Sequence, residues 1–301
     1  MDSSVKSASD KRYQVLVIFL LSIFALLAIL PFLLLVSSSF TDEATLLTEG
    51  YSFVPKKFSV YSYQYLFGSN GARILRAYGM TFLTTIIGTS ISLLIGPMLG
   101  WGLSRKDYRR GKALTLMVFF CMLFNGGIVP SYIMWTTAFG VKNTIFGLIF
   151  PTLIFNGFYI MLYKNNFASN IHPALIEAAK IDGAGEFYIY FKIVLPLSLP
   201  ILATIGLMVG LGYWNDWTNG LYYISDTKLY TLQQFLKSII DNISNLSSMA
   251  GQAGVAETIA KMPGSSIRMT MAVIGILPVM ILYPFFQKAF VAGIALGGVK
   301  E

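Results

Sequence analysis

Residues 171–196 read IHPALIEAAKIDGAGEFYIYFKIVLP and form the longest polar interruption on one side of an otherwise apolar chain. Pro173 suits the first turn of a helix, because that turn does not use the N–H group that proline lacks. Gly183 can adopt the left-handed backbone conformation that ends a helix. Beyond it, apolar residues recur at helical spacing and lead into an apolar span. We therefore predict a helix, a turn and a second helix over 171–188, with His172 as a helix-start residue.

The first of these helices has a face suited to docking. Leu175, Ala178 and Asp182 share one side at helical spacing, and Glu177 lies on the neighbouring side. Two small residues, Ala178 and Ala179, stand beside the Glu177 carboxylate. A small-residue knob with one charge fits a groove on a partner; the alternative is an ordinary amphipathic connector.

The spacing of the stretch carries a resemblance to a known family. Glu177-Ala178-Ala179 is followed after three residues by Gly183 and after nine more by Ile193-Val194-Leu195-Pro196, which resembles the EAA loop of bacterial ABC-importer permeases. In that family the loop is a coupling helix that sits in a cleft of the ATPase subunit. The resemblance implies ATPase-coupling roles for Glu177, Ala178, Ala179, Asp182, Gly183, Leu195 and Pro196.

The composition is that of a membrane protein. Of 301 residues, 55% are hydrophobic and only 12% are charged, which is about half the usual charged fraction. The net charge of +8 is spread between apolar runs, which favours lipid headgroups over nucleic acid as the partner. With one cysteine, Cys121, and one histidine, an intrachain disulfide is impossible and a cysteine metal site is excluded. We predict no catalytic residues, no metal and no cofactor.

Six charge-free apolar segments are long enough to cross a bilayer as helices, since about 20 residues span its hydrocarbon core. They are about 15–36, 79–103, 113–138, 144–163, 193–214 and 269–287. The sequence therefore predicts an all-α membrane protein with a cytoplasmic tail over 1–14, a six-span domain over 15–290 and a cytoplasmic tail over 291–301. Residues 37–78 and the polar segment before Pro263 are expected at the outer surface.

The basic residues orient these spans. The two tails, the loops 104–113 and 164–192, and Lys288 just after the sixth span hold 13 of the 22 lysines and arginines in little chain, and residues 105–112 alone hold five. The positive-inside rule places this side, with both termini, in the cytoplasm, and the resemblance implies the cytoplasmic membrane of a bacterium. The predicted coupling helix then faces the compartment that contains ATP.

The source of energy must be another subunit. No G-x-x-x-x-G-K-[ST] pattern occurs in the chain, so it cannot cradle nucleotide phosphates by that route and is not expected to be an enzyme. The six segments also contain no charged residue, whereas ion-coupled carriers usually keep an ionisable group at membrane depth. A stand-alone secondary carrier is therefore the weakest alternative.

Three further stretches resemble the carbohydrate group of these permeases, which is MalG-like, and within it the LplC/YtcP-like oligosaccharide permeases. They are residues 37–67, the WND run at 214–216 with 226–236, and the C-terminal YPFFQKAFVAGIALGGVKE. The resemblance implies a type I ABC importer permease of MetI-like fold. It also implies a second homologous permease, two ATP-binding ATPase subunits and an extracytoplasmic solute-binding lipoprotein. A permease for another solute, such as an amino acid or phosphonate, is the alternative.

Two more sets of residues follow from the resemblance and from sugar chemistry. The tail beyond the sixth helix is expected to touch the ATPase pair through Gly297, Gly298, Val299 and Lys300, although Glu301 departs from relatives that end in glycine. Aromatic faces stack on sugar rings, and amides and carboxylates pair with hydroxyls. A possible substrate path with that mixture is Tyr213, Trp214, Asn215, Asp216, Trp217 and Asn219; the alternative is an interfacial aromatic belt.

Overall fold

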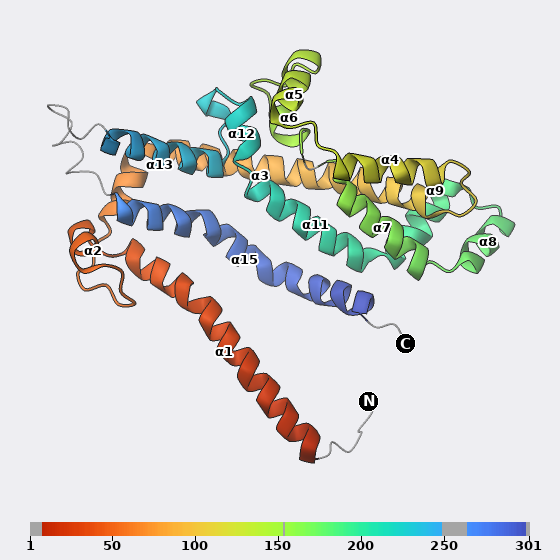
Figure 1. Ribbon diagram of the computed structural model, residues 1–301, viewed down its shortest axis with the longest axis horizontal. Coiled ribbons are helices and arrows are strands. Elements are labelled where there is room, and N and C mark those ends of the chain that lie inside the picture. The colour runs from red at the N-terminus through yellow and green to blue at the C-terminus, as the bar shows by residue number, and fades with distance from the viewer. Residues whose placement is uncertain (1–7, 153, 249–263, 299–301) are drawn as a thin grey trace. The chain divides into compact units, whose positions relative to one another are not determined.

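The computed structural model describes residues 8–152, 154–248 and 264–298, and these residues are overwhelmingly helical (Figure 1). Within them the one β-bridge joins Thr41 and Phe58. The expected all-α fold is thus confirmed.

The α-helices are α1 (Ala8–Ser39), α2 (Glu43–Glu49), α3 (Tyr61–Ser104), α4 (Gly111–Leu123), α5 (Ile128–Ile133), α6 (Ile145–Ile149), α7 (Gly157–Asn170), α8 (Pro173–Ile181), α9 (Glu186–Ile189), α10 (Leu195–Leu197), α11 (Leu199–Trp214), α12 (Thr218–Tyr223), α13 (Leu232–Ser248) and α15 (Ser265–Gly298). Two π-helices, η1 (Met134–Ala138) and η2 (Tyr190–Val194), and the 3-10 helix η3 (Thr227–Leu229) complete them.

Three described helical stretches are long and apolar enough to cross a membrane: Arg12–Ser39, Asn70–Ser104 and Ser265–Pro284. Two bent pairs bring the number to five if each is one span: Gly111–Leu123 with Ile128–Ala138, bent by 113°, and Glu186–Leu197 with Leu199–Trp214, bent by 80°. The predicted span 144–163 is not one helix, because α6 ends at Ile149 and α7 begins at Gly157. Six spans therefore remain a prediction.

Helix α3 begins much earlier than predicted. The sequence suggested a surface loop up to residue 78, but the helix starts at Tyr61. Leu66, Ile74 and Ala77 are almost completely buried at helical spacing, which gives this aromatic segment a packed face. A second unpredicted helix, α13, buries Leu232 and Phe235 in the same way.

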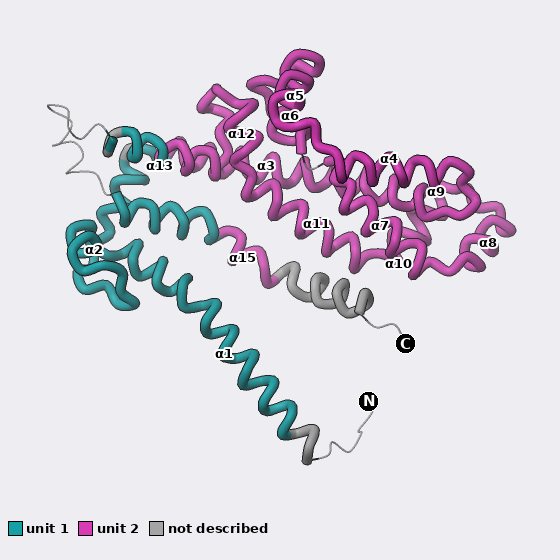
Figure 2. The backbone as a smooth tube through the Cα atoms, in the orientation of Figure 1, with its two compact units in different colours: residues 1–71, 240–277 teal, residues 72–239, 278–301 magenta. Residues whose placement is uncertain are grey.

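The described chain forms two compact units, shown in Figure 2: residues 1–71 with 240–277, and residues 72–239 with 278–301. In the first unit the Glu43 carboxylate caps the start of α15. It accepts hydrogen bonds from the backbone N–H groups of Ser265 and Ser266, both at 2.7 Å. The Ser266 hydroxyl also contacts that of Ser62, at 2.6 Å. Polar side chains thus satisfy the N–H groups that a helix start leaves unpaired.

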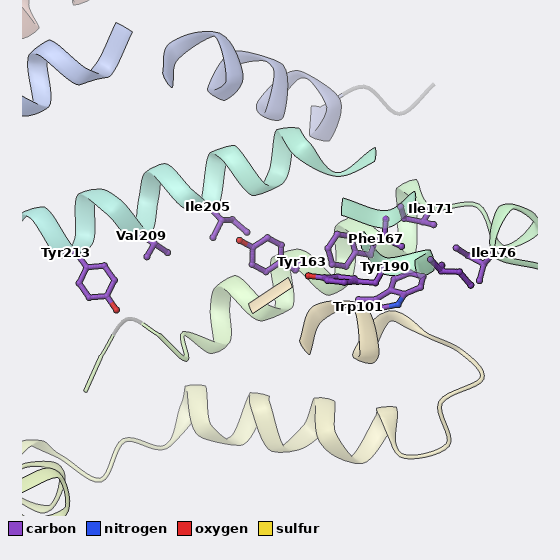
Figure 3. Packing of buried hydrophobic residues seen from close by; sticks show 11 residues of the cluster. Trp101, Tyr163, Phe167, Ile171, Ile176, Tyr190, Ile205, Val209 and Tyr213 are labelled. Atoms are coloured by element: carbon purple, nitrogen blue, oxygen red, sulfur yellow. The ribbon is translucent and has the colours of Figure 1, made fainter. Parts of the chain in front are cut away.

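The second unit is held together by close helix approaches at small residues. A Cβ added to Gly100 in α3 would lie 2.5 Å from the Cβ of Tyr163 in α7. Small residues at such crossings let two backbones approach, which is a general device of membrane helices. The unit's buried cluster combines side chains from α3, α7, α11 and the segment 171–194 (Figure 3).

Candidate functional site

The candidate site comprises residues 172–196, here called the EAA hairpin, which lies at one end of the second unit (Figure 2). Its first helix, α8, begins after His172, whose Nδ1 accepts a hydrogen bond from the N–H of Ala174 at 3.3 Å. Pro173 occupies the first helical position, where its missing N–H is no loss. His172 therefore starts the helix as predicted. No group of three or more His, Cys, Asp or Glu residues that could hold a metal occurs in the described ranges.

The turn of the hairpin depends on Gly183. Its φ is +80°, the left-handed conformation that the sequence suggested. The N–H of Gly183 donates to the carbonyl of Lys180 at 3.0 Å, and that of Ala184 donates to the carbonyl of Ala179 at 2.9 Å. This pair of bonds is a Schellman motif, which ends a helix and turns the chain. A side chain at residue 183 would meet open space, so backbone conformation alone demands glycine there.

The second arm of the hairpin leads into α11 through a bend. Helix α9 continues into the π-helix η2 and the three-residue helix α10, which contains Leu195 and Pro196. The axis then turns by 80° into α11. Proline cannot donate a backbone hydrogen bond, and π-turns often mark functional positions. Leu195 and Pro196 thus shape the junction between the hairpin and a predicted span.

The inner face of the EAA hairpin is part of the core of its unit. Ile176, Ile189 and Val194 are buried in one cluster with α3, α7 and α11. Figure 3 shows the side chains of this cluster along one line. Its buried members are Trp101, Tyr163, Phe167, Ile171, Ile176, Ile189, Tyr190, Val194, Ile205, Val209 and Tyr213. The hairpin is therefore packed rigidly on the helices from which it projects.

The outer face is open. Leu175, Glu177, Ala178 and Asp182 are exposed, whereas Ala179 packs partly against the core cluster. The large aliphatic side chain of Ile181, at the end of α8, is 86% exposed. The Glu177 side chain forms no hydrogen bond or ion pair with any described residue. The exposed docking residues therefore share a surface that presents apolar groups and two available carboxylates, those of Glu177 and Asp182.

An ionic cluster that the sequence analysis missed joins the hairpin to the basic loop after α3. Arg105 donates from Nε to Asp107 Oδ1 at 2.8 Å and from Nη1 to Glu186 Oε2 at 2.9 Å. Lys180 Nζ lies 3.0 Å from Glu186 Oε1 and 3.5 Å from Asp107 Oδ2. The hydrogen bond from Arg105 lowers the pKa of the Asp107 carboxyl to about 2, against the opposing effect of desolvation. From the sequence, loop 105–112 was interpreted only as an orientation signal. The basic residues of this loop and the acidic Glu186 of the hairpin were the signal from which an ion pair could have been predicted.

Arg105 is the most enclosed member of this cluster. Its side chain is 14% exposed, and its guanidinium carbon lies 5.2 Å from the centre of the Trp101 ring. Such cation–π contacts strengthen as water is excluded. A cavity of about 420 Å³ adjoins the pair, with Tyr108, Phe187 and Tyr190 in its wall. The arginine thus forms part of the packed structure beneath the hairpin.

The residues of the predicted substrate path have diverse positions. Tyr213, Trp214 and Asn219 are almost fully buried. Tyr213 Oη donates to the Ile149 carbonyl at 2.8 Å, and Asn219 Nδ2 donates to Thr152 Oγ1 at 2.9 Å. Tyr213 thus joins α11 to the end of α6, and Asn219 joins α12 to the turn that follows α6.

The other three path residues differ among themselves. Asp216 Oδ1 accepts from the N–H groups of Thr218 and Asn219 at 2.9 and 3.1 Å, so it caps α12; burial raises its pKa. Asn215 and Trp217 are exposed, and Lys237 Nζ lies 5.8 Å from the Trp217 ring centre. Of the six predicted path residues, Asn215 and Trp217 alone are exposed.

The C-terminal tail differs from expectation in its backbone. Helix α15 continues through Gly297 and Gly298, so these two residues do not extend beyond the sixth helix as predicted. Glycine lowers helix stability by about 1 kcal/mol but does not forbid a helix. The other predicted tail residues, Val299 and Lys300, and the terminal Glu301 lie outside the described residues.

Comparison with known proteins gives matches along nearly the whole chain. The family model "Binding-protein-dependent transport system inner membrane component" matches residues 3–296. The chain is 34% identical over 291 residues to the polygalacturonan/rhamnogalacturonan transport system permease protein YtcP of Bacillus subtilis, covering 97% of this chain and 99% of that protein. It is 34% identical over 274 residues to protein LplC of the same organism, covering 91% and 90%.

A solved structure is similar as well. The chain superposes with a TM-score of 0.75 and 28% identity on a chain from the crystal structure of a bacterial ABC transporter involved in the import of the acidic polysaccharide alginate. The match covers 96% of this chain and all of the other. The chain therefore shares its fold with a component of a known importer.

Proposed function

The chain belongs to the family of binding-protein-dependent transport system inner membrane components, and from that premise we propose that it is the subunit through which an ATP-driven importer moves an oligosaccharide or larger glycan. As a permease subunit of an ABC importer it is not an enzyme; ATP hydrolysis belongs to partner ATPases. The observation that supports the proposal is the EAA hairpin, whose sequence spacing resembles the family's ATPase-coupling loop and which combines the Gly183 turn with an exposed Glu177–Ala178 surface.

The carbohydrate class of the solute is supported by the names of similar proteins. YtcP is named for polygalacturonan and rhamnogalacturonan, and the solved importer for alginate. A third relative, 26% identical over 284 residues and covering 92% of each chain, is the arabinooligosaccharide permease AraQ of Halalkalibacterium halodurans. Oligogalacturonides and alginate oligomers are therefore the first candidates for uptake assays, with neutral arabino-oligosaccharides as the comparison. The two exposed path residues, Asn215 and Trp217, are the candidates for solute contact.

The coupling mechanism follows from the two faces of the hairpin. We propose that α8 inserts into a cleft of one ATPase subunit, with Ala178 and Ile181 against apolar groups and Glu177 paired to a basic residue. Burial of a large aliphatic side chain contributes about 1.5–3 kcal/mol. Because Ile176 and Val194 are packed among the spans, a displacement of α8 by the ATPase would move α7 and α11 with it rather than bend a loop.

The same proposal also specifies the partner subunits of the chain and its orientation in the membrane. As an inner membrane component, it works with a second permease, ATPase subunits and a solute-binding protein; we propose one homologous permease, two ATPases and a lipoprotein. The basic residues favour cytoplasmic termini and a cytoplasmic EAA hairpin.

We also propose that the C-terminal end touches the ATPase pair. The candidates are Gly297, Gly298, Val299 and Lys300. Deletion of residues 297–301 is expected to lower transport-linked ATP hydrolysis while membrane levels stay unchanged. Unchanged hydrolysis at matched levels would show that the end of the chain is not needed for coupling.

The central experiment uses two matched glycine variants in the assembled importer. Gly183→Val forces a β-branched residue to a positive φ, where such residues are outliers. Gly185→Val, two residues away, is the control, because Gly185 has φ −75° and a side chain there meets open space. Membrane level, ATPase copurification and sugar uptake are measured for both.

Gly183→Val is expected to reach the membrane but to lose ATPase copurification or uptake, whereas Gly185→Val keeps both. If Gly183→Val binds the ATPase and transports as the parent chain does, the hairpin is only a connector and the coupling proposal fails. If the complex takes up an amino acid or phosphonate and no sugar, the assignment as an importer permease stands, but the proposed carbohydrate class of the solute is wrong.

A further inference from the structure

The ionic cluster connects the EAA hairpin to a helix to which it has no direct chain connection. Along the chain, the hairpin follows α7 and leads into α11. Arg105 comes directly after α3, and its partner Glu186 is 81 residues away at the start of α9. Lys180, near the end of α8, contacts the same two carboxylates as Arg105. The cluster therefore attaches both arms of the hairpin to the end of α3.

The geometry of Arg105 makes this attachment directional. The planar guanidinium faces the Trp101 ring and presents different edges to Asp107 and Glu186. A fork of fixed N–H groups holds two carboxylates at set angles, which the single point charge of lysine cannot do. Two cations and two carboxylates also neutralise one another, so the cluster retains no net charge for an outside partner.

Apolar packing alone would hold α3 less specifically. The contacts between α3 and the hairpin in the core cluster are dispersive, and such contacts are non-directional. Hydrogen bonds between charged groups are short and angle-dependent. The bonds of Arg105 therefore add direction-dependent contacts between α9 and the end of α3 to this apolar packing.

We propose that Arg105 is a positioning residue that clamps the EAA hairpin to α3, so that displacement of the hairpin by the ATPase moves α3 together with α7 and α11. This inference rests on the proposed function, because it assigns a third helix to the movement that the hairpin transmits. Glu186 is the partner that completes the clamp on the hairpin side.

The first test measures sugar taken up per ATP hydrolysed, using the complete importer in proteoliposomes. Arg105→Gln and Glu186→Gln are each expected to lower this ratio about threefold to tenfold, and the double variant is expected to be no worse than the more severe single one. Lys106→Gln is the matched control: it removes the same charge from the same loop, at an exposed residue outside the cluster. It should leave the ratio unchanged.

Glu186→Gln also distinguishes loss of the clamp from a folding defect. Its side chain is 57% exposed, and the change leaves Arg105 stacked on Trp101 and bonded to Asp107. Arg105→Lys keeps the charge without the fork, so its ratio is expected between those of the parent and Arg105→Gln. A purely structural role would lower complex yield and leave uptake per ATP constant.

The second test follows the movement directly. Spin labels at positions 106 and 174, in a Cys121→Ser background, report the distance between the loop after α3 and the start of α8. In the parent complex this distance is expected to stay the same with and without ATP. In Glu186→Gln the distance is expected to change when ATP is added, or the distribution of distances to become broader.

The outcomes separate the two proposals. An importer whose parent form takes up no sugar and recruits no ATPase would overturn the proposed function. An active parent whose Arg105→Gln and Glu186→Gln variants keep the parent's uptake per ATP and the parent's label distances would overturn the clamp alone.

Discussion

The ring of Tyr213 in α11 occupies the space that a side chain at residue 88 of α3 would need. A Cβ built on Gly88 would lie 2.3 Å from Cζ of that ring. The same ring carries the hydroxyl that donates to the Ile149 carbonyl at 2.8 Å. One aromatic residue thus joins α11 to both α3 and the end of α6, through shape on one side and a hydrogen bond on the other.

The first prediction concerns Gly88. Gly88→Ala is expected to destabilise the protein by about 1–3 kcal/mol, because the packed ring must move to admit a methyl group. Gly79→Ala in the same helix is the control, since a Cβ there meets nothing within 4 Å and alanine favours a helix. Thermal unfolding in detergent checks this; equal melting temperatures for both variants would contradict the close approach.

The second prediction distinguishes a structural from a solute-binding Tyr213. Tyr213→Phe leaves the buried Ile149 carbonyl without its donor, which costs about 1–3 kcal/mol. We expect a lower melting temperature with an unchanged uptake KM. Trp217→Ala tests the exposed part of the predicted path and is expected to raise the uptake KM. If Tyr213→Phe instead raises the uptake KM and leaves the melting temperature unchanged, Tyr213 contacts the solute and its role is not only structural.

The third prediction tests orientation. In a Cys121→Ser background, single cysteines at exposed positions 109 and 174 are expected to resist a membrane-impermeant thiol reagent in intact cells. A cysteine at exposed position 142 should react readily, because the basic-residue bias puts that turn outside. Labelling of 109 or 174 in intact cells, with 142 protected, would reverse the predicted topology.

The fourth prediction is a pH dependence of the ionic cluster. The pKa of Asp107 is lowered from 3.8 to about 2 in the folded protein, so its ionised form stabilises the fold above pH 3.8 and this contribution is lost as the pH falls towards 2. The side chain is 59% exposed, which limits the contribution to about 1 kcal/mol or less.

The measurement compares melting temperatures of the parent and Asp107→Asn in detergent between pH 7 and pH 3. Their difference should be constant from pH 7 to pH 5 and should shrink below about pH 4. Asp182→Asn is the control, because the Asp182 side chain forms no hydrogen bond or ion pair with described residues. If the difference in melting temperature between the parent and Asp107→Asn is as large at pH 3 as at pH 7, the ionised Asp107 carboxylate is not the source of the stabilisation.

Local features of the EAA hairpin could be predicted because their causes are local. Pro173 starts a helix, Gly183 takes a positive φ and His172 stands at the helix start, and each depends on the residue type and its immediate neighbours. The helical class and the apolar runs followed from composition and periodicity for the same reason. Boundaries were less predictable: α3 begins at Tyr61 because tertiary burial of Leu66 and Ile74 supports a helix there.

What the sequence by itself determined was therefore the helical class, the main apolar runs and the coupling motif, whereas helix α13 and the break within residues 144–163 were not predicted. Only the tertiary structure decided which distant residues meet: Arg105 with Glu186, and Gly88 with Tyr213. Both contacts join residues far apart in the chain, and no local propensity or spacing encodes such a pairing. The same long-range packing buried Tyr213 and Trp214, whose residue types alone suited a solute path equally well.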